Sequence, residues 1–387
     1  MAEIFEQYMD DFGPERIILV HDTKTGMKGM LVIDNTARGP GKGGCRMAPD
    51  LTLSTVARLA RTMTWKWAMV DIFMGGAKAG IVADPKSPNK EEIVRAYIKA
   101  LKEYIPSQYV FGLDMGLNER DAAVVVDELG DMGGAIGTPA ELGGLPYDQL
   151  GLTGYGVAVA ASAIAENMNR DLRDTAISIQ GFGAVGFSAA KFLAERGANI
   201  VAISSVDGAL YDPNGLDIEK LGTLREKAGD RAVLEYSAKK AIPLGKELTV
   251  NCDILIPAAK QDVITSENVK NVKAKIVIEA ANMPTSSEAQ EYLHGNGTFL
   301  LPDFIANAGA VIGGGIAMDM RHSVNRIDKD DVYRAIEKKM SANAKLVLEE
   351  SRRLGALPRN IVLNMAKERV LKAMEQRGRI SSRAVYK

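Results

Sequence analysis

Three lysines lie in segments whose composition could support chemistry. Lys42 lies in GPGKGGCR and Lys78 in GGAKAG, so glycines flank both amines. Because glycine has no side chain, a ligand can approach the backbone closely beside them. Lys66 lies in TMTWKWAMV, on an otherwise apolar helix face, where burying an ammonium without a partner is costly. The alternative, three ordinary solvated lysines, stays open above all for Lys42.

A second motif has the spacing G-x-G-x-x-G of a dinucleotide-binding turn. It consists of Gly181, Phe182, Gly183, Ala184, Val185 and Gly186. The first glycine permits a tight turn, the second lets backbone approach a pyrophosphate, and the third lets helix and strand pack closely. Free N–H groups at the helix start would then bind the phosphates. A glycine turn without a ligand is the alternative, but the motif lies between an apolar strand and a helix, and a second strand follows.

The cofactor's ribose is expected to contact a residue about 20 positions after these glycines. Ser204 and Ser205 occupy that place, and Asp207 follows slightly later. An acidic side chain there favours NAD, because it bonds to the ribose 2′-hydroxyl and repels a 2′-phosphate. Ser205 does neither, so the sequence predicts NADP or NAD with a slight preference for NADP, unless Asp207 turns inward.

The elements that must position these motifs change in pattern near residue 150. Before it, hydrophobic periodicity predicts strands at 17–21 and 28–34 and helices at 54–70 and 90–104. The glycine-rich passage ELGGLPYDQLGLTGYG is expected to be a loop leading into a helix over 157–167. Short β-branched runs then alternate with helices, which indicates an α/β fold with a parallel, doubly wound sheet. The predicted strands are 176–180, 199–204, 253–257 and 275–279, with helices at 185–196, from 329 through 350, and at 358–375.

Composition excludes several classes of protein. The chain has 387 residues, 46% hydrophobic and 25% charged, which suits a soluble globular protein of two domains. A net charge of −1 gives no electrostatic case for binding nucleic acid or a membrane surface. Two cysteines without a CxxC pair and three widely separated histidines predict neither a disulfide framework nor a metal site. The start of the chain does not resemble a secretory signal, and a cytoplasmic location is expected.

The lysine segments resemble the signature of the glutamate/leucine/phenylalanine/valine dehydrogenase family, and most closely its glutamate-type members. The spacings, 24 residues from Lys42 to Lys66 and 12 from Lys66 to Lys78, agree with those members. The resemblance covers nearly the whole chain, continuing in FGLDMG, LTGYGV, QGFGAVG, PAAKQDVIT, EAANMPTSSEAQ and LPDFIANAGAV. It implies two α/β domains with a cleft between them. Residues 1–150, completed by helices in 331–387, would form a substrate and oligomerisation domain, and 151–330 a Rossmann-type dinucleotide-binding domain.

The resemblance also implies a reaction, the reversible NAD(P)-dependent conversion of an L-amino acid to a 2-oxo acid and ammonia. Lys78 matches the family's catalytic lysine and Asp114 its catalytic aspartate, although the family usually carries prolines around that aspartate and this chain has FGL. After hydride leaves the substrate Cα, Lys78 would act as base on the water that attacks the iminium carbon. Asp114 would then carry a proton to the leaving amine.

Binding roles follow from the same resemblance. Lys66 matches the lysine that holds the substrate α-carboxylate, and Gly44 lies in the matching substrate-binding segment. Thr153 and Asn282 match positions near the nicotinamide half of the cofactor, and Asn307 lies near the substrate. Asparagines in turns are the alternative reading for the last two.

The identity of the amino acid is less clear from the sequence. Lys42 matches the lysine that glutamate-type members use for the distal carboxylate, which favours L-glutamate. The family's second distal contact, a serine, falls at or near Gly314, and the usual S-Y-F-E-W stretch is absent. A different amino acid is therefore the alternative. Tyr155 also replaces a more usual arginine in the LTGYGV turn, a change to which the sequence assigns no role.

Two other classes of function are alternatives. Another Rossmann-type dehydrogenase, folate-linked or acting on hydroxy acids, would explain QGFGAVG but not the three lysines and Asp114 together. A non-catalytic metabolite or nucleotide sensor would explain the missing pocket residues. Retention of both Lys78 and Asp114 argues against a sensor, because binding alone needs no proton shuttle. The resemblance implies a homo-oligomer, commonly a hexamer, whose partners are small molecules and not nucleic acid or membrane.

Overall fold

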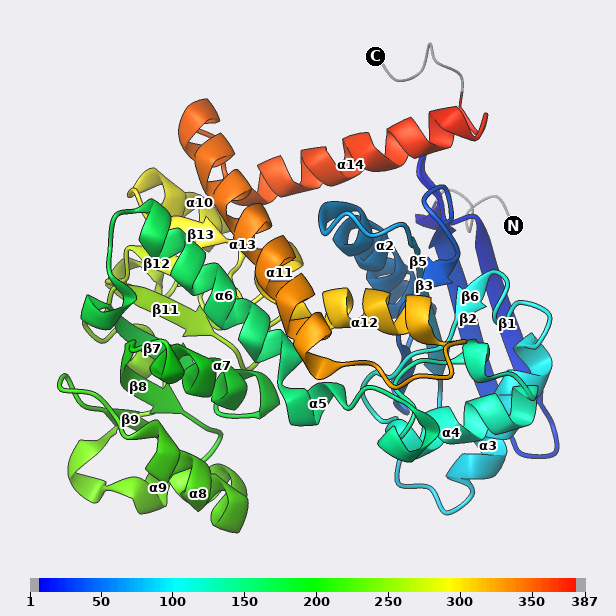
Figure 1. The fold of residues 1–387 in the computed structure, drawn as a ribbon, viewed down its shortest axis with the longest axis horizontal. Helices are drawn as coiled ribbons and strands as arrows, with labels where there is room; N and C mark the ends of the chain where they lie inside the picture. The colour runs from blue at the N-terminus through cyan, green and yellow to red at the C-terminus, as the bar shows by residue number, and fades with distance from the viewer. Residues whose placement is uncertain (1–6, 381–387) are drawn as a thin grey trace. The chain divides into compact units, whose positions relative to one another are not determined.

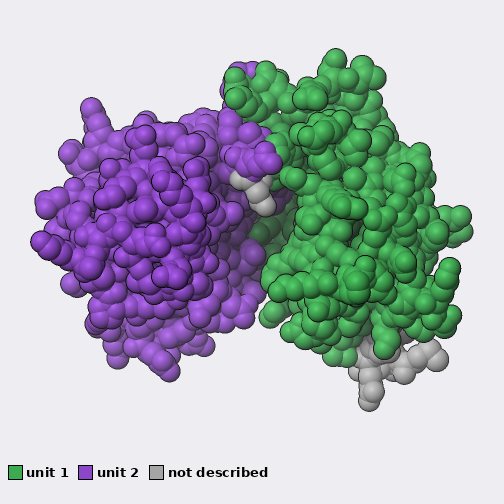
Figure 2. All heavy atoms as spheres, turned by 90° about the horizontal axis from the view of Figure 1, so that it is seen from below, with its two compact units in different colours: residues 1–147, 314–332, 364–387 green, residues 148–313, 333–363 purple. Residues whose placement is uncertain are grey.

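The computed structural model describes residues 7–380, whose contacts divide the chain into two compact units (Figure 2). Unit 1 takes the chain through residue 147, residues 314–332 and the chain from 364. Unit 2 takes residues 148–313 and 333–363. The range 331–387, expected to complete the first domain, thus contributes residues to both units. No helix within 7–380 is long and apolar enough to cross a membrane.

Unit 1 is built on a six-stranded mixed sheet (Figure 1). Its strands are β1 (Arg16–Asp22), β2 (Met27–Asn35), β3 (Gly41–Lys42), β4 (Cys45–Met47), β5 (Gly75–Ile81) and β6 (Tyr109–Val110). The order is β1-β2-β5-β3-β6, with β4 also paired to β5. β2 pairs antiparallel with β1 and β5, whereas β3 and β4 run parallel to β5. The predicted strands at 17–21 and 28–34 are confirmed.

Helices α2 (Leu53–Met69), α3 (Lys90–Leu101) and α4 (Glu119–Leu129) complete the N-terminal part of unit 1. α2 begins where the Thr52 side chain accepts a hydrogen bond from Thr55 N, an N-cap that satisfies one free amide. α2 packs closely on β5, since a Cβ on Gly76 would lie 2.0 Å from Thr64 Oγ1. The helix predicted over 90–104 ends at 101, shortly before Pro106.

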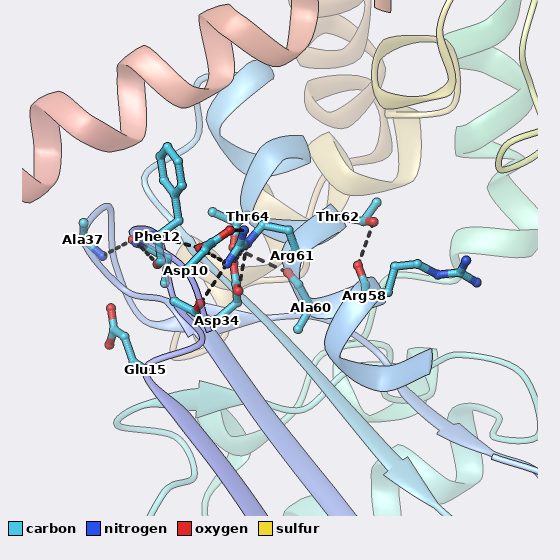
Figure 3. Close-up of polar contacts among 12 residues, drawn as sticks. Asp10, Phe12, Glu15, Asp34, Ala37, Arg58, Ala60, Arg61, Thr62 and Thr64 are labelled. Atoms are coloured by element: carbon cyan, nitrogen blue, oxygen red, sulfur yellow. Dashed lines mark hydrogen bonds and ion pairs between the residues drawn. The ribbon is translucent and has the colours of Figure 1, made fainter. Parts of the chain in front are cut away.

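A charged cluster ties α2 to β2 (Figure 3). Arg61 Nε donates to both carboxylate oxygens of Asp34 at 2.9 Å, and its two terminal nitrogens donate to Asp10 at 2.6 and 2.8 Å. Thr64 Oγ1 donates to Asp34 at 2.5 Å. We name Asp10, Asp34 and Arg61 the Asp34 cluster. Asp34 is buried, so these donors replace the water that its carboxylate loses.

Unit 2 is built on a seven-stranded sheet of order β10-β9-β8-β7-β11-β12-β13. Its strands are β7 (Ala176–Gln180), β8 (Asn199–Ser204), β9 (Ala209–Tyr211), β10 (Ala241–Ile242), β11 (Ile254–Pro257), β12 (Ile276–Ile278) and β13 (Phe299–Leu301). The run from β8 to β13 is parallel, and β9 and β10 pair antiparallel at one edge. The predicted parallel sheet is confirmed.

Most helices of the chain's second half belong to unit 2. They are α5 (Tyr147–Leu150), α6 (Leu152–Asn167), α7 (Ala184–Glu195), α8 (Ile218–Ala228), α9 (Ala232–Tyr236), α10 (Ser287–Gly295), α11 (Asp303–Ala306), α12 (Gly309–Met320), α13 (Lys329–Leu354) and α14 (Pro358–Gln376). α5, α12, α13 and α14 each contribute residues to both units. Arg369 of α14 donates to the carbonyls of Ala68 and Met69 at 2.8 Å, within unit 1.

One predicted loop is in fact helical. The LTGYG segment forms the first turns of α6, which begins at Leu152 rather than near residue 157. The glycines serve packing instead of breaking the helix. A Cβ on Gly154 would lie 2.2 Å from Ser188 Oγ, and one on Gly156 would lie 2.9 Å from Gly309 Cα. Glycine thus lets α6 approach its neighbours within unit 2 more closely than any other residue could.

Candidate active site

The chemical centre of unit 1 is an ion pair between Lys78 and Asp114. Lys78 lies in the middle of β5 and is 6% exposed, and its Nζ pairs with Asp114 Oδ2. The other oxygen, Oδ1, accepts hydrogen bonds from Met115 N at 2.6 Å and from Arg46 at 3.4 Å. Strand pairing explains this meeting, since β4, which carries Arg46, runs beside β5, and Cys45 bridges to Leu113.

The charges around Asp114 favour its ionised form. Burial acts to raise its pKa, but the charge and hydrogen bond of Lys78, followed by the charge of Arg46, lower the pKa below its ordinary value. An ionised aspartate in contact with an ammonium group can accept a proton and pass it on.

The glycines of GKGG allow the Asp114 loop to approach. A Cβ on Gly44 would lie 2.4 Å from Leu113 O and 2.9 Å from Asp114 Cβ. One on Gly43 would lie 1.8 Å from Ala77 O. The structure therefore places Gly44, predicted to bind substrate, directly against the loop that carries Asp114.

Lys42 is buried and its amine is satisfied by backbone. Its Nζ donates to Phe111 O at 2.8 Å and to Val110 O at 3.1 Å. Burial, and then the charges of Lys78 and Arg321, lower the pKa of this amine well below its ordinary value. A Cβ on Gly112 would lie 2.3 Å from the Lys42 Nζ, so the unusual FGL sequence leaves room for the amine.

Lys66 and Gly314 both lie next to Trp67, Lys66 in sequence and Gly314 in space. Lys66 is buried on α2, two residues after Thr64, which contacts Gly76 of β5. The neighbouring Trp67 Nε1 donates to Lys42 O at 2.9 Å. A Cβ on Gly314 would lie 3.8 Å from the Trp67 ring and 3.6 Å from Ile136, which is ordinary contact, so a side chain would fit there.

Sequence reasoning missed Arg46 and Arg321. Arg46 directly follows the GKGGC segment, and a charged residue on the strand after a lysine motif was an available signal. Arg321 follows α12, where the family's usual sequence is absent, so no pattern pointed to it.

The glycine motif of unit 2 forms an open turn between β7 and α7. Gly181 has φ +99°, and a Cβ on Gly186 would lie 1.9 Å from Gly181 O, so both positions require glycine. A Cβ on Gly183 would meet nothing within 4 Å, and α7 starts at Ala184 without a side-chain cap. Open space above free helix amides fits the pyrophosphate of a dinucleotide. Phe182 is buried in the core against Phe187 and Val185 lies in the first turn of α7, so the motif's other residues shape the turn.

Ser204, the last residue of β8, and Ser205 form side-chain hydrogen bonds within unit 2. Ser204 Oγ accepts from Gly181 N at 3.1 Å and donates to Glu247 at 3.0 Å. Ser205 Oγ donates to Asp230 O at 2.8 Å, and Asp207 N donates to Ser205 Oγ at 3.2 Å. The Asp207 side chain itself is exposed. The position predicted to contact the ribose therefore carries a buried hydroxyl, that of Ser205, with an exposed carboxylate two residues later.

The two predicted site asparagines are in contact. Asn307 Nδ2 donates to Asn282 Oδ1 at 3.0 Å and to Ala281 O at 3.4 Å. Thr153 is half-buried in the first turn of α6. Tyr155, in place of the more usual arginine, donates from its hydroxyl to Glu337 at 2.6 Å and packs on Arg196.

Comparisons with known proteins identify one family over both halves of the chain. A family model described as glutamate/leucine/phenylalanine/valine dehydrogenase matches residues 143–378, and the model of the family's dimerisation domain matches residues 14–131. A glutamate dehydrogenase of Aeropyrum pernix is 37% identical over 362 residues, covering 89% of this chain and 85% of that protein.

Solved structures give the same result. The glutamate dehydrogenase of Peptoniphilus asaccharolyticus has a TM-score of 0.83 and 28% identity, covering 95% of this chain and 93% of that one. The hetero-hexameric glutamate dehydrogenase of Thermus thermophilus, in its leucine-bound form, has a TM-score of 0.82 and 28% identity, covering 97% and 95%.

Proposed function

Because the chain belongs to the glutamate/leucine/phenylalanine/valine dehydrogenase family, we propose that it catalyses the reversible, NAD(P)-dependent oxidative deamination of an L-amino acid, with L-glutamate as the leading substrate. The observation that carries the proposal is the buried pair of Lys78 and Asp114. A protein that only binds a metabolite has no need of a lysine and an aspartate in proton-transfer contact.

In this proposal unit 1 supplies the groups that bind substrate and move protons. Lys66 holds the α-carboxylate. Lys78 first passes its proton to Asp114, with which it is paired. The neutral Lys78 amine then removes a proton from the water that adds to the iminium carbon, and Asp114 delivers its proton to the amine, which leaves as ammonia. Arg46 and Met115 N fix the Oδ1 of Asp114, which keeps Oδ2 towards Lys78. Bound NAD(P) supplies the hydride acceptor.

Unit 2 would hold the dinucleotide. The open turn at Gly183 and the uncapped start of α7 support pyrophosphate binding there, and Thr153 and Asn282 are proposed near the nicotinamide. NADP slightly preferred over NAD is the finer proposal, because Ser205 brings no charge to the ribose position. The exposed Asp207 is the group that would oppose it.

The same chemistry on another amino acid is the second candidate. Lys42 already gives two donors to backbone carbonyls, and Gly314 has space where a side chain would fit. A distal carboxylate would therefore have fewer donors here than the family pattern supplies.

Assembly and location are also proposals. A homo-oligomer, a hexamer in the finer form, is supported by the match to the dimerisation domain and by the hexameric relative. Light scattering of the purified protein tests it. A cytoplasmic location is consistent with two free, buried cysteines.

The decisive experiment follows reduced cofactor at 340 nm with each of the twenty L-amino acids and with NAD or NADP. A signal with glutamate confirms the leading substrate, and a signal with another amino acid supports the second candidate. Lys78→Ala is expected to lower turnover by about 1000-fold or more while cofactor binding persists. Lys99→Ala, at an exposed lysine of α3, is the matched control. Retained turnover in Lys78→Ala would refute the assignment.

A further inference from the structure

Unit 2 contains a buried charged cluster that the proposed reaction does not use. Glu279 is 0% exposed and Asp303 is 2% exposed. Arg359 Nη1 lies 2.9 Å from Asp303 Oδ1 and 3.5 Å from Glu279 Oε2, and its guanidinium stacks on the Phe304 ring at 4.7 Å. We name Glu279, Asp303 and Arg359 the Glu279 cluster. Burying two carboxylates is costly, so their retention needs a reason.

The cluster joins two segments that follow neighbouring strands. Glu279 follows β12 and Asp303 follows β13, and Asp303 N donates to Glu279 Oε2 at 3.1 Å. Asp303 Oδ2 in turn accepts from Met283 N at 3.0 Å. Met283 has φ +49°, a conformation that side-chain-bearing residues rarely adopt and that the surroundings must hold.

The joined segments carry the two site asparagines. Asn282 directly precedes Met283, and Asn307 N donates to Asp303 O at 3.2 Å in the turn that ends α11. The side chains of Asn282 and Asn307 then meet at 3.0 Å. The carboxylates of the cluster thus fix the backbone on both sides of this contact.

We propose that Glu279, Asp303 and Arg359 are positioning residues that hold Asn282 and Asn307 at the spacing required by the nicotinamide and the substrate. The roles of the two asparagines rest on the proposed function, whereas the mechanical link between cluster and asparagines rests on the contacts above.

In this proposal the protonation state of Glu279 sets how firmly the cluster holds the segments that bear Asn282 and Asn307. Burial, and then the charge of Asp303, raise the pKa of Glu279 to about 7, although Arg359 opposes the shift. The other groups that contact Glu279 are neutral: Gln290 Nε2 donates to Oε1 at 3.3 Å, and Thr285 lies beside it. Below about pH 7 Glu279 is mostly protonated, so it no longer competes as a carboxylate for Arg359. Above it two carboxylates compete for Arg359, and the segments that bear the asparagines loosen.

The test compares Glu279→Gln, Arg359→Met and the double variant. The control is Arg353→Met, which removes an exposed ion pair with Glu350 on α13. Affinity for NADP and NAD is measured by fluorescence titration at pH 6 and pH 8.5. Amide hydrogen exchange of residues 280–308 is measured on the same proteins without nucleotide.

The unaltered protein is expected to bind nucleotide more tightly at pH 6, and Glu279→Gln to lose this dependence on pH. Arg359→Met is expected to weaken binding at pH 8.5 by about tenfold, because fewer chains hold the asparagines in place. The double variant is expected to recover part of that loss, since it leaves one buried carboxylate, Asp303, without a counter-charge where Arg359→Met leaves two. Amide exchange at residues 280–308 is expected to be fastest in the variants that bind nucleotide most weakly. Arg353→Met is expected to match the unaltered protein in both affinity and exchange.

A Glu279→Gln variant with unaltered pH dependence, or a double variant no better than Arg359→Met, would overturn the proposal. A merely structural role predicts equal losses at both pH values. If the unaltered protein binds neither nucleotide, the proposed function fails by itself. The exchange data then decide alone, because the link between the cluster and the 280–308 segment does not depend on the ligand.

Discussion

Two clusters in this molecule have the same composition and opposite surroundings. The Asp34 cluster in unit 1 and the Glu279 cluster in unit 2 each combine two carboxylates with one arginine. Arg61 grips Asp34 through Nε and Asp10 through both terminal nitrogens, and the Asp10 side chain is 55% exposed. Arg359 instead reaches both carboxylates through one nitrogen, and neither carboxylate is exposed.

The difference lies in where the surplus negative charge goes. In the Asp34 cluster, partial burial acts to raise the pKa of Asp10, but hydrogen bonds from Arg61 and the backbone lower it, so this acid stays ionised in contact with water. Burial raises the pKa of Asp34, and Arg61 counteracts that rise. In the Glu279 cluster both carboxylates are buried, and burial raises the pKa of Glu279 to about 7. Solvent access, rather than composition, decides whether such a cluster responds to pH.

The largest expected effect comes from breaking the Asp34 cluster. Arg61→Met leaves Asp34 buried without a counter-charge, which is expected to destabilise the protein by about 3–5 kcal/mol. Thermal unfolding at fixed protein concentration measures the loss. Arg58→Met, on the same helix, is the control, since Arg58 is exposed and points away from the cluster in Figure 3. Equal effects of the two substitutions would show that the cluster contributes nothing.

A smaller effect that depends on pH is expected from Glu279→Gln. The folded-state pKa of Glu279 lies above its unfolded value of 4.5, so the folded protein binds more protons between about pH 4.5 and 7. The unaltered protein therefore loses stability as pH rises through this window, and the glutamine variant does not. From pH 5 to 8.5 the difference in unfolding free energy is expected to move by about 2–3 kcal/mol in favour of the variant. A constant difference would mean that Glu279 does not titrate there.

The smallest effect should come from Asp10→Asn. Its carboxylate is half exposed, so its ion pair with Arg61 is screened by water, and the expected cost is about 0.2–1 kcal/mol. The cost should shrink further in 1 M salt. A loss that persists undiminished in high salt would place Asp10 among the buried charges and remove the contrast between the clusters.

Periodicity predicted most of the helices and the parallel sheet, because those elements depend on local burial patterns. Neither cluster could be predicted, since their partners are far apart in sequence. Asp10 and Arg61 are 51 residues apart, and Asp303 and Arg359 are 56 apart. The predicted start of α6 was also wrong, because glycine usually interrupts helices but here allows close packing.

Part of the candidate site could be predicted, because local sequence marks some of its residues. Glycines beside Lys78 and apolar neighbours around Lys66 marked those two residues, whereas the only local signal for Arg46 was its place directly after the GKGGC segment. Its closeness to Asp114 arises only when β4 pairs with β5. The sequence thus identified Lys66 and Lys78 but not Arg46, which donates to Oδ1 of Asp114.

The segmental make-up of unit 1 has a consequence for synthesis on the ribosome. The carbonyls of Ala68 and Met69, at the end of α2, each accept a side-chain hydrogen bond from Arg369, about 300 residues later in the chain. Unit 1 therefore cannot reach its final form while it emerges, although its six strands are all translated early. The first unit stays incomplete during the synthesis of unit 2, until its last segment, which begins at residue 364, has been made.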